Sequence, residues 1–147
     1  DPAMRRLAPN RRVLCAAPAY LAEHGAPQSL DDLRAHAQLA AENQSAWRLE
    51  GPDGPVTFRA HSRVRTNSSE VARELVLAGA GIALRSTWDV GDELRDGRLL
   101  RVLPQYAGAS DVAIFALTAG RARAENRVRA FIEFLAGLYG DVPEWDK

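Results

Sequence analysis

The sequence predicts an α/β fold in which short buried strands alternate with helices. An apolar run over residues 12–17 (RVLCAA) is typical of a buried strand, and residues 67–78 carry apolar side chains at helical spacing. A second apolar run over 111–119 precedes a helical pattern over 124–140. Because strands and helices alternate along the chain, we expect a sheet that contains parallel strand pairs.

Two short helices are expected after the first strand. Pro18 is favoured at a first helical position, and Gly25 ends this helix. Ser29 is a suitable N-cap for the second helix, because Asp32 lies three residues later, as in a capping box. The chain from 12 onward therefore begins as a strand followed by two helices.

The middle of the chain predicts strands, a hairpin and a longer helix. Residues 38–42 and 47–51 are strand candidates. The turn sequence GPDGP then leads into an alternating stretch, so 47–66 is expected to form a hairpin. The helix over 67–78 is expected to begin at Asn67.

The remaining elements continue the alternation. They are a strand at 81–86, a short helix at 89–97 ended by Gly97, a strand at 98–104 ended by Pro104, a crossover between lobes at 104–110, the strand at 111–119 and the helix at 124–140.

The glycine pair in AGAGIALRS, Gly79 and Gly81, resembles a phosphate-binding loop only at first sight. A dinucleotide loop follows a strand and opens a helix, whereas these glycines follow a helix and precede a strand. We therefore interpret Gly79 or Gly81 as a helix C-cap with positive φ.

Bulk composition is that of a globular protein of one domain's length. The 147 residues are 46% hydrophobic and 26% charged, with a formal net charge of zero. Without a basic excess, this chain alone is a poor candidate for binding nucleic acid. No membrane span or signal peptide is visible, and the lone Cys15 favours a reducing compartment, so we expect a cytoplasmic protein.

Catalytic and metal-binding patterns are not apparent. His24, His36 and His61 are widely spaced and Cys15 is alone, which disfavours a metal site. Cys15 lies in an apolar strand, where a thiol packs as a small hydrophobe. No Walker, G-x-S-x-G, H-E-x-x-H or EF-hand motif is present, so we expect neither an enzyme nor a cofactor.

Three strand-end or helix-start segments are candidate binding loops. TNSSE places Asn67 and two serines at a helix start, where free N–H groups attract anions, although simple helix capping explains the same residues. RSTW places Arg85 at a strand end, where it can pair with a carboxylate or form a surface salt bridge, while Trp88 stacks on a ligand or packs. AAPAY (16–20) is the third segment.

The strings RRVLCAAPAYLAEHGAPQSLDDLRAHAQL, AGAGIAL, DVGDELRDGRLLRVLP and RVRAFIEFL occur in this order. Together they resemble the C-terminal effector-binding domain of LysR-type transcriptional regulators, over about residues 5–140. That family has a type 2 periplasmic-binding-protein fold, with two α/β lobes around a cleft.

The resemblance implies a division of the chain. Residues 1–11 are expected to end the first-lobe segment, 12–104 to form a complete second lobe, and 105–147 to supply the crossover and the returning strand and helix of the first lobe. The chain then looks like a fragment without the start of the first lobe and without the N-terminal winged helix-turn-helix, through which alone such regulators engage DNA. Family members commonly form dimers and tetramers, so a homodimer or higher oligomer is expected, and the 111–119 and 124–140 segments are expected to support self-association.

The resemblance also implies an effector site. The ligand is a small molecule held between the lobes, with no metal, cofactor or membrane involved, and we expect a carboxylate or another small anion. The second-lobe residues carried over to this site are Ala16, Ala17, Pro18, Asn67, Ser68, Ser69, Arg85 and Ser86. Many relatives have proline where this chain has Arg85.

Two other function classes compete with a regulator's sensing domain. A solute-binding protein can share this fold, but the unpaired cysteine and the absence of a visible signal peptide disfavour export. An α/β enzyme needs a nucleophile, a base and an orienting group close together, and no such grouping is visible. The upstream reading frame separates the regulator from the transporter.

Overall fold

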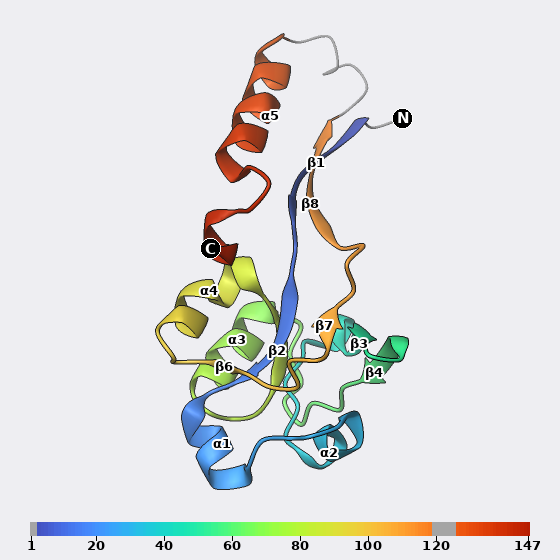
Figure 1. The fold of residues 1–147 in the computed structure, drawn as a ribbon, viewed down its shortest axis with the longest axis vertical. Coiled ribbons are helices and arrows are strands. Elements are labelled where there is room, and N and C mark those ends of the chain that lie inside the picture. Colours follow the sequence, from blue (N-terminus) through green and yellow to red (C-terminus); the bar gives the residue numbers. More distant parts are fainter. Residues whose placement is uncertain (1–2, 119–125) are drawn as a thin grey trace. The chain divides into compact units, whose positions relative to one another are not determined.

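The computed structural model describes residues 3–118 and 126–147, which form two compact units. Unit 1 contains the residues up to Asn10 and from Ser110 onward, and unit 2 contains Arg11–Ala109. Residue 119 of the expected strand and residues 124–125 of the expected helix lie outside the described part. Figure 1 gives the element labels used below.

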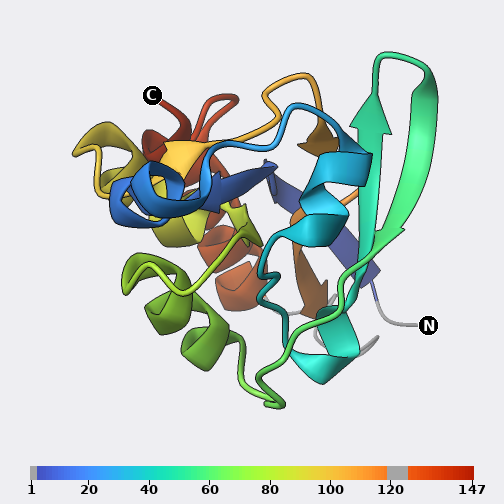
Figure 2. The ribbon, with the colours of Figure 1, turned by 90° about the horizontal axis from the view of Figure 1, so that it is seen from below.

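Unit 2 is built on two three-stranded sheets. In the first, β2 (Arg12–Ala16) lies between β5 (Ala83–Ser86) and β6 (Leu100–Arg101). In the second, β3 (Ala46–Gly51) lies between β4 (Gly54–Arg59) and β7 (Ala107–Gly108), and Figure 2 shows β3 and β4 as a two-stranded hairpin. The first sheet carries the strand predicted at 12–17 at its centre.

The expected parallel pairs are wrong for these sheets. Among the described strands, every ladder is antiparallel, and parallel pairing is limited to isolated bridges from Gln38 to Ser62 and to Ile82. An apolar run indicates that both faces of a strand are buried, but it carries no information on the direction of the neighbouring strand.

The four helices of unit 2 are α1 (Pro18–His24), α2 (Leu30–Ala35), α3 (Ser69–Leu77) and α4 (Thr87–Arg95). Most of their predicted end signals are confirmed. Pro18 begins α1 and Gly25, with φ +76, ends it, while Ser29 Oγ accepts the Asp32 N–H at 3.0 Å. Of the two cap candidates for the longer helix, Asn67 and Ser68, it is Ser68 that caps α3, so this helix begins later than at Asn67.

Three predicted strands or helices have different bounds. Of residues 38–42, only Gln38 forms bridges. The hairpin expected at 47–66 ends at Arg59, and the His61 N–H that follows donates to the side chain of Gln38. The strand expected at 98–104 is limited to β6, since Leu103 adopts a φ of +48. The helix expected at 89–97 begins earlier, at Thr87, with a break in helical geometry at Val90.

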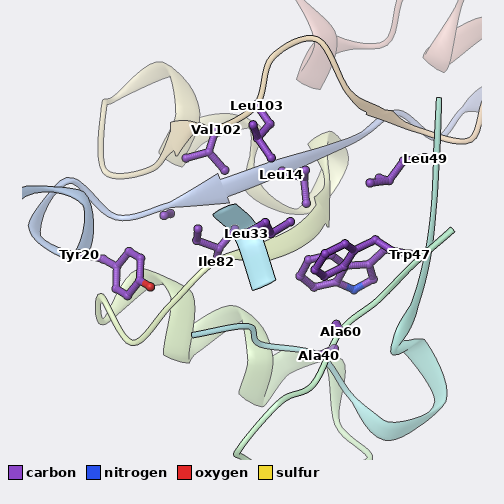
Figure 3. Close-up of a cluster of buried hydrophobic side chains, with 12 residues drawn as sticks. Leu14, Tyr20, Leu33, Ala40, Trp47, Leu49, Ala60, Ile82, Val102 and Leu103 are labelled. Atoms are coloured by element: carbon purple, nitrogen blue, oxygen red, sulfur yellow. The ribbon is translucent and has the colours of Figure 1, made fainter. Parts of the chain in front are cut away.

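Successive side chains of β2 enter two separate buried clusters. Leu14 and Ala16 join the cluster drawn in Figure 3, which also contains Trp47 from β3 and Leu33 from α2. The alternate residues Val13, Cys15 and Ala17 join a second cluster, which includes Val76 of α3 and Val90 of α4. Because strand side chains alternate between faces, β2 is buried on both sides.

Unit 1 contains an antiparallel pair of strands and the C-terminal helix. The strands are β1 (Ala3–Pro9), which the sequence did not predict, and β8 (Ala113–Thr118). Helix α5 (Asn126–Tyr139) packs against β1, and Arg5 forms an ion pair with Glu133 at 3.2 Å. A short 3₁₀ helix, η3 (Glu144–Asp146), follows α5.

The two glycines after α3 have different structural roles. Gly79 has a φ of +80, as expected for a residue that ends a helix. Gly81 has no such φ, but a Cβ at this position would lie 2.5 Å from the carbonyl oxygen of Ala37. That same carbonyl accepts the N–H of Ile82 at 2.8 Å, so Gly81 allows the chain to approach Ala37 closely.

Asparagine substitutions separate these two roles. We expect Gly79→Ala to cost about 1 kcal/mol because of its left-handed conformation, and Gly79→Asn to cost less, since asparagine tolerates that region. At Gly81, both Ala and Asn should cost about 1–3 kcal/mol, because the clash is with backbone. Urea unfolding measures these free energies, and a larger rescue by asparagine at 81 than at 79 would contradict the assignment.

Candidate functional site

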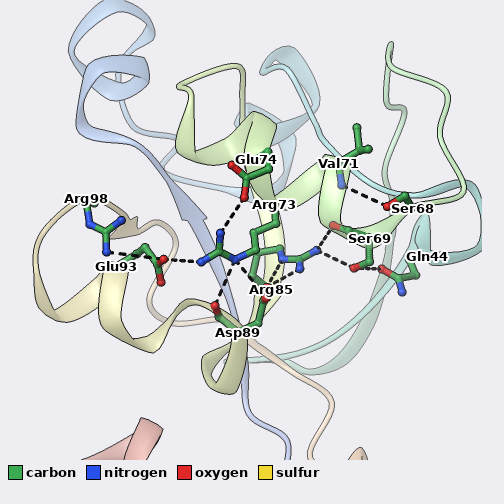
Figure 4. Close-up of polar contacts among 10 residues, drawn as sticks. All are labelled: Gln44, Ser68, Ser69, Val71, Arg73, Glu74, Arg85, Asp89, Glu93 and Arg98. Atoms are coloured by element: carbon green, nitrogen blue, oxygen red, sulfur yellow. Dashed lines mark hydrogen bonds and ion pairs between the residues drawn. The ribbon is translucent and has the colours of Figure 1, made fainter.

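Arg85 lies at the centre of a buried polar network (Figure 4). Its Nε donates to Asp89 Oδ2 at 2.9 Å, and its Nη2 contacts the same oxygen. Its Nη1 donates to the carbonyl oxygen and to the Oγ of Ser69 at 3.0 and 2.9 Å. Arg85 is only 8% exposed, so the salt bridge expected at the surface is in fact a buried one.

Arg73 of α3 extends this network along α4. Its guanidinium reaches Asp89 at 3.3 Å and also contacts Glu93, which Arg98 approaches at 3.7 Å. Burial acts to lower the pKa of Arg73, but the charges of Glu93 and Asp89 and the hydrogen bonds of Glu74 and Glu93 raise it above its ordinary value. Arg73 is therefore held as a cation by carboxylates of unit 2.

The polar residues at the start of α3 are used in three different ways. Ser68 Oγ accepts the Val71 N–H at 3.4 Å, which confirms simple capping for this one residue. Ser69 is bound by Arg85, and its Oγ also donates to Gln44 at 3.3 Å. Asn67 is exposed, and its side chain has no hydrogen-bond partner among the described residues. Two of the three residues are thus not needed as caps.

The structure brings together only some of the residues predicted for the site. Arg85 contacts Ser69, and Ser86 follows it directly at the start of α4. Ala16, Ala17 and Pro18 lie elsewhere, because β2 and β5 are antiparallel and Ser86 pairs with Arg12 at the opposite end of β2. That end lies about 13 Å from Ala16 at the usual rise of a strand.

The packing of α3 confirms this separation. Its C-terminal end, at Gly79, lies beside Ala19 and Tyr20 of α1, whereas its N-terminal end is bound by Arg85. Ala16 and Ala17 are also buried in the core, which leaves Pro18 as the exposed member of that group. Trp88 is 52% exposed, so it does not serve as a core residue.

Cys15 is a core residue, as the sequence predicted. It is fully buried, and burial raises the pKa of its thiol to about 12, with Arg85 acting to lower it and Asp89 to raise it. The thiol therefore stays protonated at neutral pH and is a poor nucleophile.

A further pocket, which the sequence did not reveal, lies within unit 2. All three histidines of the chain line it, together with Arg34, Arg59 and Arg63, and we call it the histidine pocket. Its volume is about 880 Å³. The histidines lie far apart in the sequence and come from three separate segments that line the same pocket, so no spacing motif could have revealed them.

These side chains do not form a metal centre. Among residues 3–118 and 126–147, no three His, Cys, Asp or Glu side chains come close enough to hold a metal ion. The same part of the chain contains no helix that is both long and apolar enough to span a bilayer.

Comparison with known proteins assigns the chain to a family. The model of the LysR substrate binding domain matches residues 2–139. The chain belongs to the LysR substrate-binding domain family. It is 36% identical over 141 residues to the HTH-type transcriptional regulator DmlR of Escherichia coli (strain K12), covering 93% of this chain and 45% of DmlR.

Solved LysR regulators have the same fold. The regulatory domain of CrgA from Neisseria meningitidis superposes with a TM-score of 0.81 at 28% identity, covering 95% of this chain and 69% of that one. Full-length AphB from Vibrio cholerae gives 0.80 at 26% identity, covering 92% and 47%. The fold is therefore the type 2 periplasmic-binding-protein fold of LysR domains, and the chain spans less than half the length of the curated LysR relatives it matches.

The buried pair of Arg85 and Asp89 should contribute strongly to stability. Asp89→Ala leaves the buried Arg85 and the half-buried Arg73 without this carboxylate, and we expect a loss of about 3 kcal/mol in the free energy of unfolding. Asp92→Ala is the matched control on the same helix, because its ion pair with Arg95 is exposed and should contribute less than about 1 kcal/mol. Equal losses for the two variants in urea unfolding would contradict the burial argument.

Proposed function

We propose that this chain is the effector-sensing domain of a LysR-type transcriptional regulator. Unit 2 is the second lobe, and unit 1 contributes strands and a helix to the first. The polar start of α3 carries the proposal, because Asn67 is exposed there and Ser69 is fixed by Arg85. The relatives named above are transcriptional regulators, which supports a regulatory role over a transport or enzymatic one.

The wider activity follows from the family. A small molecule bound by the sensing domain alters how an N-terminal winged helix-turn-helix, outside this chain, engages DNA. Such a regulator works in the cytoplasm, where its DNA is. The buried, protonated Cys15 supports a role without covalent catalysis.

The proposed effector is a small carboxylate or another anion held at the start of α3. The N–H groups of Ser69 and Glu70 occupy the first turn of the helix, where they have no acceptor within the helix. The positive end of the helix dipole favours a negative ligand at the same place. Arg85 is already neutralised by Asp89, so its role is to fix Ser69, and direct pairing with the ligand requires Asp89 to be displaced.

Proline at position 69 tests this arrangement. Ser69→Pro removes the N–H at a position where proline suits a helix start, and Ser68 already has the extended conformation that proline requires of its predecessor. Ser69→Ala is the matched control, because it loses the same hydroxyl and keeps the N–H. In the full-length regulator, a thermal-shift panel of mono-, di- and tricarboxylates identifies a ligand, and calorimetry then measures its affinity.

We expect Ser69→Pro to bind that ligand about tenfold or more weakly than Ser69→Ala, as for the loss of a charge-assisted hydrogen bond. Equal affinities of the two variants for the ligand would show that the N–H of residue 69 does not bind it. In the same assay, unchanged affinity in Arg85→Ala would exclude Arg85 from the site.

We also propose that the regulator is a homo-oligomer and that this chain self-associates through unit 1. Large apolar side chains are well exposed on β8 and α5: Leu117 is 68% exposed, Phe134 62% and Leu138 65%. Apolar side chains gathered in this way are typical of surfaces that another chain covers.

Sedimentation over a range of concentrations tests this association. We expect Phe131→Ser combined with Phe134→Ser to shift the chain toward monomer, since both side chains are exposed on α5. Trp88→Ser, which removes an exposed aromatic side chain from unit 2, is the control and should leave the association unchanged. A monomer at every concentration of the unmodified chain would contradict the proposal.

A further inference from the structure

The residues that line the histidine pocket carry a net positive charge, although the chain as a whole has no net charge. The lining residues include Arg34, Arg59 and Arg63 and no Asp or Glu, while the formal net charge of the whole chain is zero. The acidic groups of the two neighbouring helices, Glu23 of α1 and Asp31 and Asp32 of α2, are not among the lining residues. A local excess of cations at a concave surface attracts anions.

Two of the three arginines have no carboxylate partner in the described part of the chain. Arg34 is paired with Asp31 at 3.4 Å and lies over the ring of Phe58, 5.3 Å from its centroid. The side chains of Arg59 and Arg63 form no ion pair or hydrogen bond with any other described residue. Their donors are therefore available to a ligand, in contrast with those of Arg85 and Arg73, which carboxylates of the same lobe occupy.

The hydrogen bonds around Tyr20 fix part of the pocket. Its hydroxyl accepts the Ala37 N–H at 3.0 Å and lies 2.9 Å from His36 Nδ1. His24 stacks on its ring at a centroid distance of 4.4 Å. Tyr20 is 3% exposed and belongs to the core, so its contacts fix the positions of the His24 and His36 imidazoles.

The contacts of the imidazoles determine which of their nitrogens can donate to a ligand. His24 Nδ1 lies 3.2 Å from the carbonyl oxygen of Tyr20, which only accepts hydrogen bonds, so Nδ1 carries a proton. In neutral His24 the other nitrogen, Nε2, is then an acceptor, and protonation converts it to a donor. The imidazole of His61 has no partner among the described residues, so on protonation both of its nitrogens can donate to a ligand.

We propose that the histidine pocket binds a small divalent oxyanion, either a phosphate or a dicarboxylate, and binds it more tightly as the histidines become protonated. Arginine forks match the planar or tetrahedral oxygens of both classes. The pocket is separate from the start of α3, and the proposal does not depend on the effector site there.

Sulfate is a suitable probe, because it keeps both of its charges between about pH 6 and pH 8, so that a change in its affinity over this range reports on the protein. Three imidazole signals in the ¹³C–¹H NMR spectrum report on the pocket, since every histidine of the chain lines it. We expect saturable sulfate shifts of these signals at pH 6 and an affinity about tenfold weaker at pH 8. Sodium chloride at matched ionic strength controls for screening.

The combined variant Arg59→Gln and Arg63→Gln should weaken sulfate binding at least about tenfold, as expected for the loss of charge-assisted hydrogen bonds. Arg101→Gln, on an exposed β6 residue outside the pocket, is the matched control and should bind like the unmodified chain. Thermal unfolding verifies that each variant is folded.

Competition identifies the class of ligand. Displacement of sulfate by succinate would identify dicarboxylates as the ligands of the histidine pocket. Displacement by inorganic phosphate would identify phosphates. Displacement by neither, the absence of saturable shifts in the unmodified chain at pH 6, or equal sulfate affinity in the folded double variant would overturn the proposal.

Discussion

The burial of β2 on both faces is the constraint on which the rest of unit 2 depends. Leu14 and Ala16 require an apolar layer on one side, and Val13 and Cys15 require another on the opposite side. Burial also leaves no water for its backbone groups, so hydrogen-bonding strands must lie along β2, as β5 and β6 do. The helices α3 and α4 cover one face, and α1, α2 and the β3–β4 hairpin cover the other.

Local signals in the sequence predicted most elements, because caps and apolar runs act over a few residues. Pro18, Ser29 and Gly79 mark helix ends through their own backbone or side-chain chemistry. Strand direction is not such a signal, since the partner of β2 lies far along the chain. Antiparallel pairing places Ala16 and Ser86 at opposite ends of the sheet, which separated residues that a parallel sheet would have brought together.

The candidate site was predicted in part for the same reason. The start of α3 is a local feature and was found from the residues TNSSE. Which of these residues is bound by another side chain depends on Arg85, which is distant in sequence. The partner of Arg85, Asp89, is one helical turn away, but the helix was expected to begin at 89 and so did not include the pair. The histidine pocket had no local signal at all, because its side chains come from three separate segments.

The guanidinium of Arg85 joins the beginning of one helix to the beginning of the next, since it binds Ser69 of α3 and Asp89 of α4 at the same time. Sliding α3 away from α4 breaks the hydrogen bonds of Arg85 to Ser69 and the ion pairs of Arg73 with Asp89 and Glu93. The two helices are therefore held in a fixed position relative to each other. A ligand at the proposed site at the start of α3 would therefore act on α4 through the same guanidinium.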